Sequence, residues 1–301
     1  MAPPSRSRPL NNATFSAAFA KQKTQAYGDP AARGPHSIRT LAWNPLGTLV
    51  ATGASDRGVR VWNPERAHVR NSTELRGPAA AAVDRLAWNP VKEAELASCA
   101  ADGSVRFWDV RCRAAAVAEV KIGGDGFSLA WRPDGSELVV GRKDDVLVPV
   151  SLAAMKSVAE YRQPVQTNQT VFSNSGHELF VTTGEGHVKI LDYPSMVSTP
   201  VQPTRLHSPH THDWVCTRSL ARTTGPVRAI SFSFDGAFVV GASDEPGGRD
   251  LDVAHVETGE YVHVVETGGA VGCVAWHPLR YWLAYVAEVG GLKIVGAGGN
   301  L

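Results

Sequence analysis

A unit of about 43 residues recurs along this chain and constrains its fold more than any other feature. The best-formed copy runs from Val83 to Arg111, where three short apolar segments are separated by the turns Asn89-Pro90 and Ala101-Asp102-Gly103. Proline ends the first segment because it has no amide donor, and glycine supplies the positive φ that the second turn needs. Three short strands cannot bury both faces of their sheet, so the unit needs neighbours of the same kind.

Five further copies are recognisable, and each begins with an apolar strand that ends in an aromatic residue. These blade anchors are Trp43, Trp88, Trp131, Phe172, Phe232 and Trp276. All intervals between anchors but one are about 41 to 45 residues, the period of four-stranded propeller blades, whereas helical repeats recur at about 33. Apolar alternation between Pro, Asp, Asn and Gly turns indicates strands. The sequence therefore predicts an all-β propeller. Closure of the blades into a ring protects the sheet edges that a single blade would leave exposed.

The repeats extend over residues 23–296, which we expect to form a single propeller domain followed by a flexible tail at 297–301. Residues 1–22 are basic and rich in Pro, Ser and Asn, which favours a disordered tail. The alternative, a mitochondrial transit peptide, would need more arginines on an amphipathic face. Lys23 to Tyr27 is the candidate for a closing strand that pairs beside Leu292–Val295.

One interval is too short for the pattern. Phe172 and Phe232 are about 60 residues apart, where two repeats need about 84. Met196–Leu206 and Val215–Ala221 suit outer strands, but no inner strand, turn or second-turn acid lies between them. We therefore expect six recognisable repeats and one blade reduced to its outer strand. A genuine deletion and a mis-joined gene model both explain the shortening, and either leaves sheet edges to be covered.

The same interval holds the cluster that most resembles a metal site, formed by His207, His210 and His212. Zinc sites use His, Cys and carboxylate ligands at short spacing. These histidines lie in a proline-containing stretch without a matched second pair of ligands, so we expect a solvated loop and no metal. Motifs for phosphate binding and for hydrolase chemistry are also missing, and we expect no cofactor and no small-molecule substrate.

Acidic residues recur at the second turn of the unit, at Asp56, Asp102, Asp145 and Asp244. Repetition at equivalent positions is typical of a structural role, because a catalytic pair would break the repeat. The alternative, an enzyme with a site in the central channel, would need convergent acids or histidines on inner strands, and the sequence has none. We therefore expect no catalytic residues.

Charge and hydropathy narrow the function classes further. The chain has 30 Lys+Arg against 29 Asp+Glu and a formal net charge of +1, so it lacks the basic footprint of a nucleic-acid-binding domain. No apolar run approaches the length of a membrane span. The 4 cysteines show no C-x-x-C spacing, which indicates thiols in a reducing compartment.

The dipeptide Trp108-Asp109 and the recurring turn acid resemble WD-repeat proteins. In that family the turn acid accepts hydrogen bonds from a histidine in the preceding loop. Here the histidine is mostly missing, and Pro78 stands near its expected place in the second repeat. The resemblance therefore implies that some turns are held by acid-to-backbone bonds alone.

Several segments are similar to one branch of that family, the THO complex subunit three (Tex) family. They are Val83–Pro90, Gly141–Val146, Pro226–Gly236, Val256–Gly259 and Val274–Pro278, in this order. The resemblance implies seven blades, a nuclear location and a non-enzymatic scaffold role in the THO/TREX assembly, which packages nascent mRNA for export. It implies other THO/TREX subunits as protein partners, with indirect RNA contact and no membrane. The alternative is a WD-repeat adaptor of another assembly, such as a ubiquitin-ligase substrate receptor or a chromatin complex.

Overall fold

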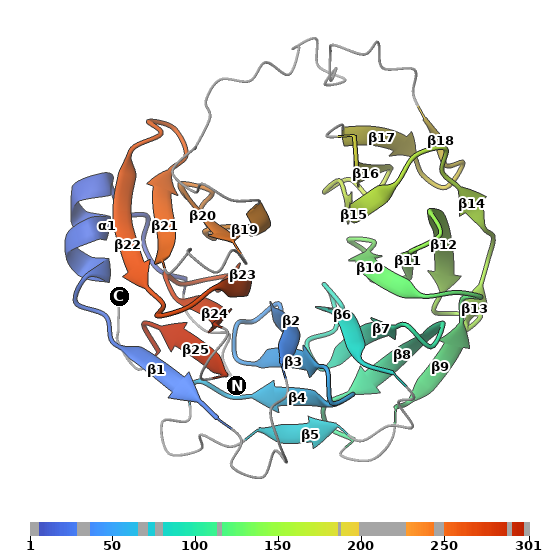
Figure 1. Cartoon of the computed structure of the whole chain (residues 1–301), viewed down its shortest axis with the longest axis horizontal. Coiled ribbons are helices and arrows are strands. Elements are labelled where there is room, and N and C mark those ends of the chain that lie inside the picture. Colours follow the sequence, from blue (N-terminus) through green and yellow to red (C-terminus); the bar gives the residue numbers. More distant parts are fainter. Residues whose placement is uncertain are drawn as a thin grey trace. The chain divides into compact units, whose positions relative to one another are not determined.

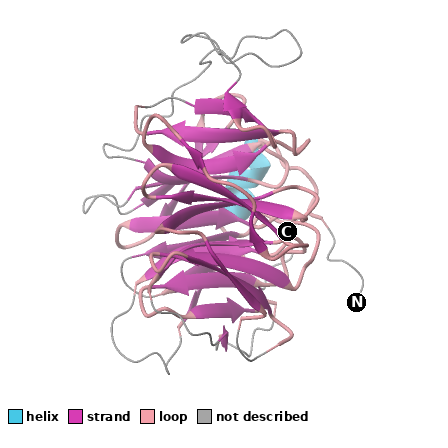
Figure 2. Cartoon of the chain, turned by 90° about the vertical axis from the view of Figure 1, so that its right-hand side faces the viewer, coloured by secondary structure: helices cyan, strands magenta, loops and turns pink. Residues whose placement is uncertain are grey.

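The regular structure in the computed structural model is almost entirely antiparallel β-sheet. The described residues are 6–28, 37–65, 72–75, 81–112, 116–185, 188–198, 227–243, 250–287 and 291–297. They form six sheets and one helix (Figure 1), and the helix stands out among the strands in Figure 2. The chain divides into two compact units, one of residues 1–86, 113–115 and 220–301 and one of residues 87–112 and 116–219.

Three of the sheets belong to the first unit, and each has four strands. One has the order β2-β3-β4-β5, with β2 Ile38–Trp43, β3 Val50–Ala54, β4 Val59–Trp62 and β5 Thr73–Leu75. The next is β19-β20-β21-β22, with β19 Val227–Phe232, β20 Phe238–Ser243, β21 Asp250–His255 and β22 Tyr261–Glu266. The third is β1-β25-β24-β23, with β1 Thr24–Tyr27, β23 Val271–Trp276, β24 Leu283–Ala287 and β25 Leu292–Val295.

The remaining sheets lie wholly or mostly in the second unit. The sheet β6-β7-β8-β9 has β6 Val83–Trp88, β7 Glu95–Ala100, β8 Ser104–Asp109 and β9 Ala118–Lys121, and the division between units falls inside β6. The sheet β10-β11-β12-β13 has β10 Gly126–Trp131, β11 Glu137–Arg142, β12 Val146–Ser151 and β13 Lys156–Ser157, with β14 Tyr161–Arg162 also on β12. The sheet β15-β16-β17-β18 has β15 Thr167–Phe172, β16 Glu178–Thr183, β17 Val188–Asp192 and β18 Val197–Ser198.

The strands of the best-formed repeat lie where the sequence predicts them, in β6, β7 and β8. The predicted closing strand is also confirmed. Strand β1 pairs antiparallel with β25, and Thr24 lies opposite Val295 while Tyr27 lies opposite Leu292. The N-terminal strand is thus the outermost strand of the sheet built from the last repeat. Of the interval expected to hold a reduced blade, β18 is described, and Val215–Ala221 lies outside the described residues.

The disordered tail expected at residues 1–22 is wrong for part of that stretch. Helix α1, Asn12–Phe19, begins at the N-cap Asn11, whose Oδ1 accepts a hydrogen bond from the Thr14 amide at 2.9 Å. Phe15 and Phe19 lie four residues apart, hence on one helix face, and both are buried. Their apolar burial outweighs the polar composition that favoured disorder.

The buried face of α1 packs on the first unit, where the helix contacts β22. The ring of Phe15 stacks on Phe238 with centroids 3.9 Å apart and meets Tyr281 edge-on at 5.3 Å. Before the helix, the Ser7 amide donates to the Leu279 carbonyl at 2.8 Å. Residues 6–27 thus form a strap over this unit that ends in β1.

We predict that Phe15→Ala destabilises the protein by about 3–5 kcal/mol, because it leaves a cavity among buried aromatic rings. Denaturant unfolding measures this change in the free energy of unfolding. Ala17→Ser, on the exposed side of the same helix, is the matched control and should cost less than about 0.5 kcal/mol. Equal costs for the two substitutions would mean that the strap is not packed on the sheets.

Candidate functional site

The second turn of the first repeat is held by an arginine as well as by backbone bonds. Asp56 Oδ1 accepts a hydrogen bond from the Gly58 amide at 3.0 Å. Asp56 Oδ2 also lies 2.5 Å from the guanidinium of Arg60, on strand β4. The same guanidinium lies 3.9 Å from Glu74 on the outer strand β5. Arg60 therefore links the turn to two strands of its sheet.

The second repeat uses the same arrangement, with a shorter distance between the arginine and the outer-strand acid. Asp102 accepts hydrogen bonds from the amide and hydroxyl of Ser104 and from Arg106, whose Nη2 lies 2.7 Å away. Arg106 Nε donates to Glu119 at 3.1 Å. Burial opposes ionisation of Asp102, but the hydrogen bonds from Arg106 and Ser104 outweigh it and lower the pKa of the carboxyl. The acid is therefore held in its charged form and occupied on both oxygens.

The third repeat also pairs an arginine with an acid of the second turn, but both residues occupy other positions than in the first two repeats. Arg142, at the end of β11, pairs with Asp144 at 2.5 Å and with Glu160 at 2.9 Å. The hydrogen bond from Arg142 lowers the pKa of Asp144. The neighbouring Asp145 has a positive φ of 63° and accepts from the Thr167 amide at 2.9 Å. Asp145 thus ties its turn to the next sheet, while Asp144 takes the arginine.

The resemblance implies that some turns are held by acid-to-backbone bonds alone, and at Asp56, Asp102 and Asp144 an arginine pairs with the turn acid as well. In three sheets an arginine pairs with a turn acid and with a second acid, and sequence reasoning missed Arg60, Arg106 and Arg142. The second acid lies on the outer strand in two of these sheets, whereas Glu160 lies between β13 and β14. A signal was present in two cases, because Asp and Arg four residues apart span the turn and the following strand. Each acid is paired within its own repeat, so these carboxylates do not converge on one site.

Two other groups of predicted residues lie outside the described part of the chain, namely Asp244 and the histidines His207, His210 and His212. Among the described residues, no group of three or more His, Cys, Asp or Glu side chains is placed to hold a metal ion. Within the same residues, no helix is long and apolar enough to cross a membrane.

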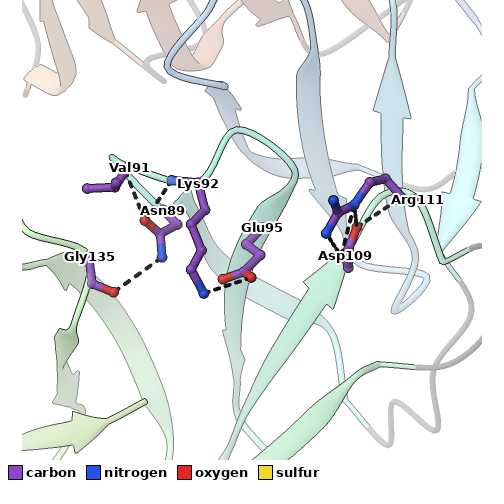
Figure 3. A network of polar contacts seen from close by, with 7 residues as sticks. All are labelled: Asn89, Val91, Lys92, Glu95, Asp109, Arg111 and Gly135. Atoms are coloured by element: carbon purple, nitrogen blue, oxygen red, sulfur yellow. Dashed lines mark hydrogen bonds and ion pairs between the residues drawn. The ribbon is translucent and has the colours of Figure 1, made fainter. Parts of the chain in front are cut away.

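Buried side chains also latch consecutive sheets together at the first turn of the repeat (Figure 3). Asn89 Oδ1 accepts hydrogen bonds from the Val91 and Lys92 amides, and its Nδ2 donates to the Gly135 carbonyl of the next sheet at 3.3 Å. Gly135 has a φ of +69°, and a Cβ there would lie 2.5 Å from Asn89 Oδ1. Glycine is therefore required for both the turn and the latch.

His277 occupies the equivalent position in the last repeat and makes the equivalent bonds. Its Nδ1 accepts from the Leu279 and Arg280 amides at 2.9 and 3.0 Å, and its Nε2 donates to the Gly47 carbonyl at 2.9 Å. Because Nδ1 accepts, the ring is neutral. Burial, with a smaller effect from the positive charge of Arg280, lowers the pKa of His277 to about 3.

The blade anchors do not all share one environment. Trp43, Trp88, Phe172 and Trp276 are buried, Trp131 is partly buried, and Phe232 is exposed. Two of the tryptophans donate to the backbone of the preceding sheet, Trp43 to the Ala275 carbonyl at 3.2 Å and Trp131 to the Ala87 carbonyl at 3.0 Å. Trp43 and Trp131 therefore connect their sheets to a neighbouring sheet, and Phe232 is the most exposed of the anchors.

We predict that Arg106→Ala destabilises the protein by about 3–5 kcal/mol at neutral pH, because it leaves Asp102 charged and unpaired next to a buried cavity. The control is Arg111→Ala, which removes the exposed pair with Asp109 (Figure 3) and should change stability little. Side-chain exposure separates the two arginines, 4% for Arg106 and 73% for Arg111. Comparable losses in chemical denaturation would contradict a structural role for the buried arginine.

We also predict that His277 makes stability depend on pH. Its pKa is lowered to about 3 in the folded state, whereas an unfolded histidine titrates near about 6.5. Between these values the unfolded state binds the extra proton, so the free energy of unfolding should fall by about 1.4 kcal/mol per pH unit below about 6.5. Above about pH 6.5 the contribution of neutral His277 to the free energy of unfolding is fully present.

The variant His277→Asn tests this pH dependence, because Asn89 makes the same latch elsewhere in the chain. Denaturant unfolding from pH 6.5 down to 4.5 should show a shallower slope for the variant than for the wild type. His263, whose pKa burial also lowers, titrates equally in both proteins. Parallel slopes would mean that His277 is not held neutral.

Comparison with known proteins relates this geometry to characterised sequences. The family described as "WD domain, G-beta repeat" matches residues 31–63, 70–109 and 214–245. THO complex subunit 3 of Arabidopsis thaliana is 29% identical over 279 residues, covering 83% of this chain and 86% of that protein. The WD repeat-containing protein AAC3 of Dictyostelium discoideum is 24% identical over 299 residues, covering 83% of this chain and 61% of that protein.

Among solved structures, the β-propeller domain of Cps50 (Swd1) from Myceliophteria thermophila is similar with a TM-score of 0.69. The likeness covers 88% of this chain and 97% of that domain at 18% sequence identity, so it shows the fold alone. The six sheets are accordingly the blades of a WD40 β-propeller. Together the repeats and the sequence relatives identify the chain as a WD-repeat protein that resembles THO complex subunit 3.

Proposed function

We propose that the chain is a non-enzymatic scaffold subunit of a nuclear THO/TREX complex, which supports transcription-coupled mRNA packaging and export. The observation that carries the proposal is the match to THO complex subunit 3, which extends over 83% of this chain and 86% of that protein. A relative that is similar along most of both chains shares an arrangement of repeats, and therefore of the loops that meet partners.

The chemistry of the described residues supports a scaffold more than an enzyme. The turn acids Asp56, Asp102 and Asp144 are each paired with their own arginine, so they are not available as convergent acids and bases. Strands tied by such pairs form a stiff frame on which short loops can present side chains to partner chains. We propose that residues 23–296 form this frame as a single domain.

The proposed partners are the other protein subunits of THO/TREX, with RNA contacted indirectly through them. The near balance of 30 basic and 29 acidic residues supports this division, because direct RNA binding relies on a basic surface. Neither a small-molecule substrate nor a membrane surface has a place in this proposal.

Affinity purification tests the proposal. The chain with an affinity tag is expressed in cells of its source organism, and nuclear extracts are divided into samples with and without RNase before capture. We predict recovery of THO subunits in both samples, well above the level for a tagged unrelated WD-repeat protein. Because the partners are proteins, RNase should not release them.

Two results would contradict this function. Capture of a ubiquitin ligase or a chromatin complex without THO subunits would assign the chain to another assembly. Recovery of THO subunits that disappears after RNase treatment would show that RNA, rather than direct protein contact, links this chain to the complex.

A further inference from the structure

The first part of the strap, residues 6–22, is attached to the first unit without a ladder of strand hydrogen bonds. Its backbone is tied down at two points before the helix. The Ser7 amide donates to the Leu279 carbonyl at 2.8 Å, and the Leu10 amide donates to the Tyr281 hydroxyl at 3.0 Å. Because these bonds are separate and few, the attachment of this segment depends mainly on its side chains.

Two phenylalanines of α1 provide the apolar part of that attachment. Phe15 is 0% exposed and Phe19 1% exposed, and both share a buried cluster with Phe238, Trp276 and Tyr281. The ring centroid of Trp276 lies 6.2 Å from that of Phe15 and 5.5 Å from that of Phe19. Helix α1 therefore covers an aromatic surface of the sheets, and its removal would expose that surface to water.

Helix α1 cannot persist without this contact. It has eight residues, whereas isolated helices shorter than about 12 residues are marginal in water. Thr14, Phe15 and Ser16 have low helix propensity, and the helix has no acidic residue in its first turn and no basic residue in its last. The helix should therefore lose its structure when it leaves the sheets, so docking and folding of α1 are one event.

Two side chains at this contact bury polar atoms at a cost. Among the described residues, neither Nε2 nor Oε1 of Gln22 has a hydrogen-bond partner, although both atoms are buried. The Nε1 atom of Trp276, whose ring packs against α1, is buried in the same way. A buried polar group without a partner destabilises the state that buries it. Departure of α1 would return these atoms to water, which favours an open state.

Strand β1 is held independently of the helix. It pairs with β25 along its whole length, and the Gly296 amide donates to the Lys23 carbonyl at 3.2 Å. Tyr27, at the end of β1, is 3% exposed. Loss of the helix can therefore stop between Gln22 and Lys23, and the last sheet keeps its outermost strand.

We propose that residues 6–22 open and close as one unit while β1 and the sheets stay folded. In the closed state α1 covers the rings of Phe238, Trp276 and Tyr281, and in the open state water reaches them. The segment is thus a conformational device that controls access to an aromatic surface of the first unit. The inference is independent of the THO/TREX proposal.

Native-state hydrogen–deuterium exchange of the full-length chain, at low concentrations of denaturant, tests this opening. The protection factors of the α1 amides should be at least about tenfold lower than those of β20 and β24, which contribute to the same buried cluster. Exchange in α1 should also depend more weakly on denaturant, because a local opening exposes little surface. The amides of β1 should be protected like those of β25.

Two variants change the opening in opposite directions. Gln22→Met replaces the buried amide with an apolar side chain of similar length and should slow exchange in α1 by about fivefold or more. Phe19→Ala removes a buried ring and should speed it by about tenfold or more. Ala17→Ser, on the exposed side of α1, is the control and should change these rates by less than about threefold. If Phe19→Ala fails to fold by circular dichroism, Gln22→Met decides the test.

Three results would overturn the proposal. Equal protection and equal denaturant dependence in α1 and β20 would show that the segment is released only when the sheets unfold. Loss of protection in β1 together with α1 would show that the opening does not stop at Gln22. Unchanged or faster exchange in Gln22→Met would show that the buried amide does not favour the open state.

Discussion

The apolar faces of the sheets must be covered, and the rest of this structure depends on that constraint. A four-stranded sheet with apolar residues on both faces is unstable in water, because burial of apolar surface is the main force that opposes chain entropy. Where the cover is present, the side chains are deeply buried, as Trp43 is beneath the sheet β23–β25. At the equivalent position of β19, Phe232 is 54% exposed.

Polar contacts fix the geometry of these apolar layers. The latches of Asn89 and His277 connect the first turn of one sheet to the next sheet, and Arg60 and Arg106 tie the second turn to the strands beside it. Asp56, Asp102 and Asp144 are each paired with an arginine of their own sheet, so these three carboxylates belong to the frame of the sheets. Rigid frames of this kind are suited to presenting loops to other proteins, which is the role proposed for this chain.

Much of the fold could be predicted from the sequence, because its signals are local and repeated. The period of the repeat and the turn residues place β6, β7 and β8, and the closing strand Thr24–Tyr27 follows from the need to complete the last sheet. The helix with Phe15 and Phe19 could not be predicted from composition. Its stability comes from rings at Phe238 and Tyr281 that are far away in the sequence. Tertiary burial of this kind overrides local propensity.

The contacts of the candidate site were also only partly predictable from local sequence signals. The repetition of Asp56 and Asp102 predicts turn acids, but the histidine expected from related proteins gives no indication that Arg60 and Arg106 are their partners. The exchange of Asp145 for Asp144 could not be foreseen, since it depends on the position of Arg142 at the end of β11. The exposure of Phe232 is likewise a property of its neighbours, and no feature of its own repeat reveals it.

Hydrogen–deuterium exchange tests most directly whether the local stability of a strand depends on how well the apolar face of its sheet is covered. The comparison is between the amides of β19 and those of β2, which have the same position in their sheets. Our account predicts slower exchange in β2, where Leu41 and Trp43 are buried, than in β19, where Ile230 and Phe232 are exposed. Equal protection of the two strands would contradict it.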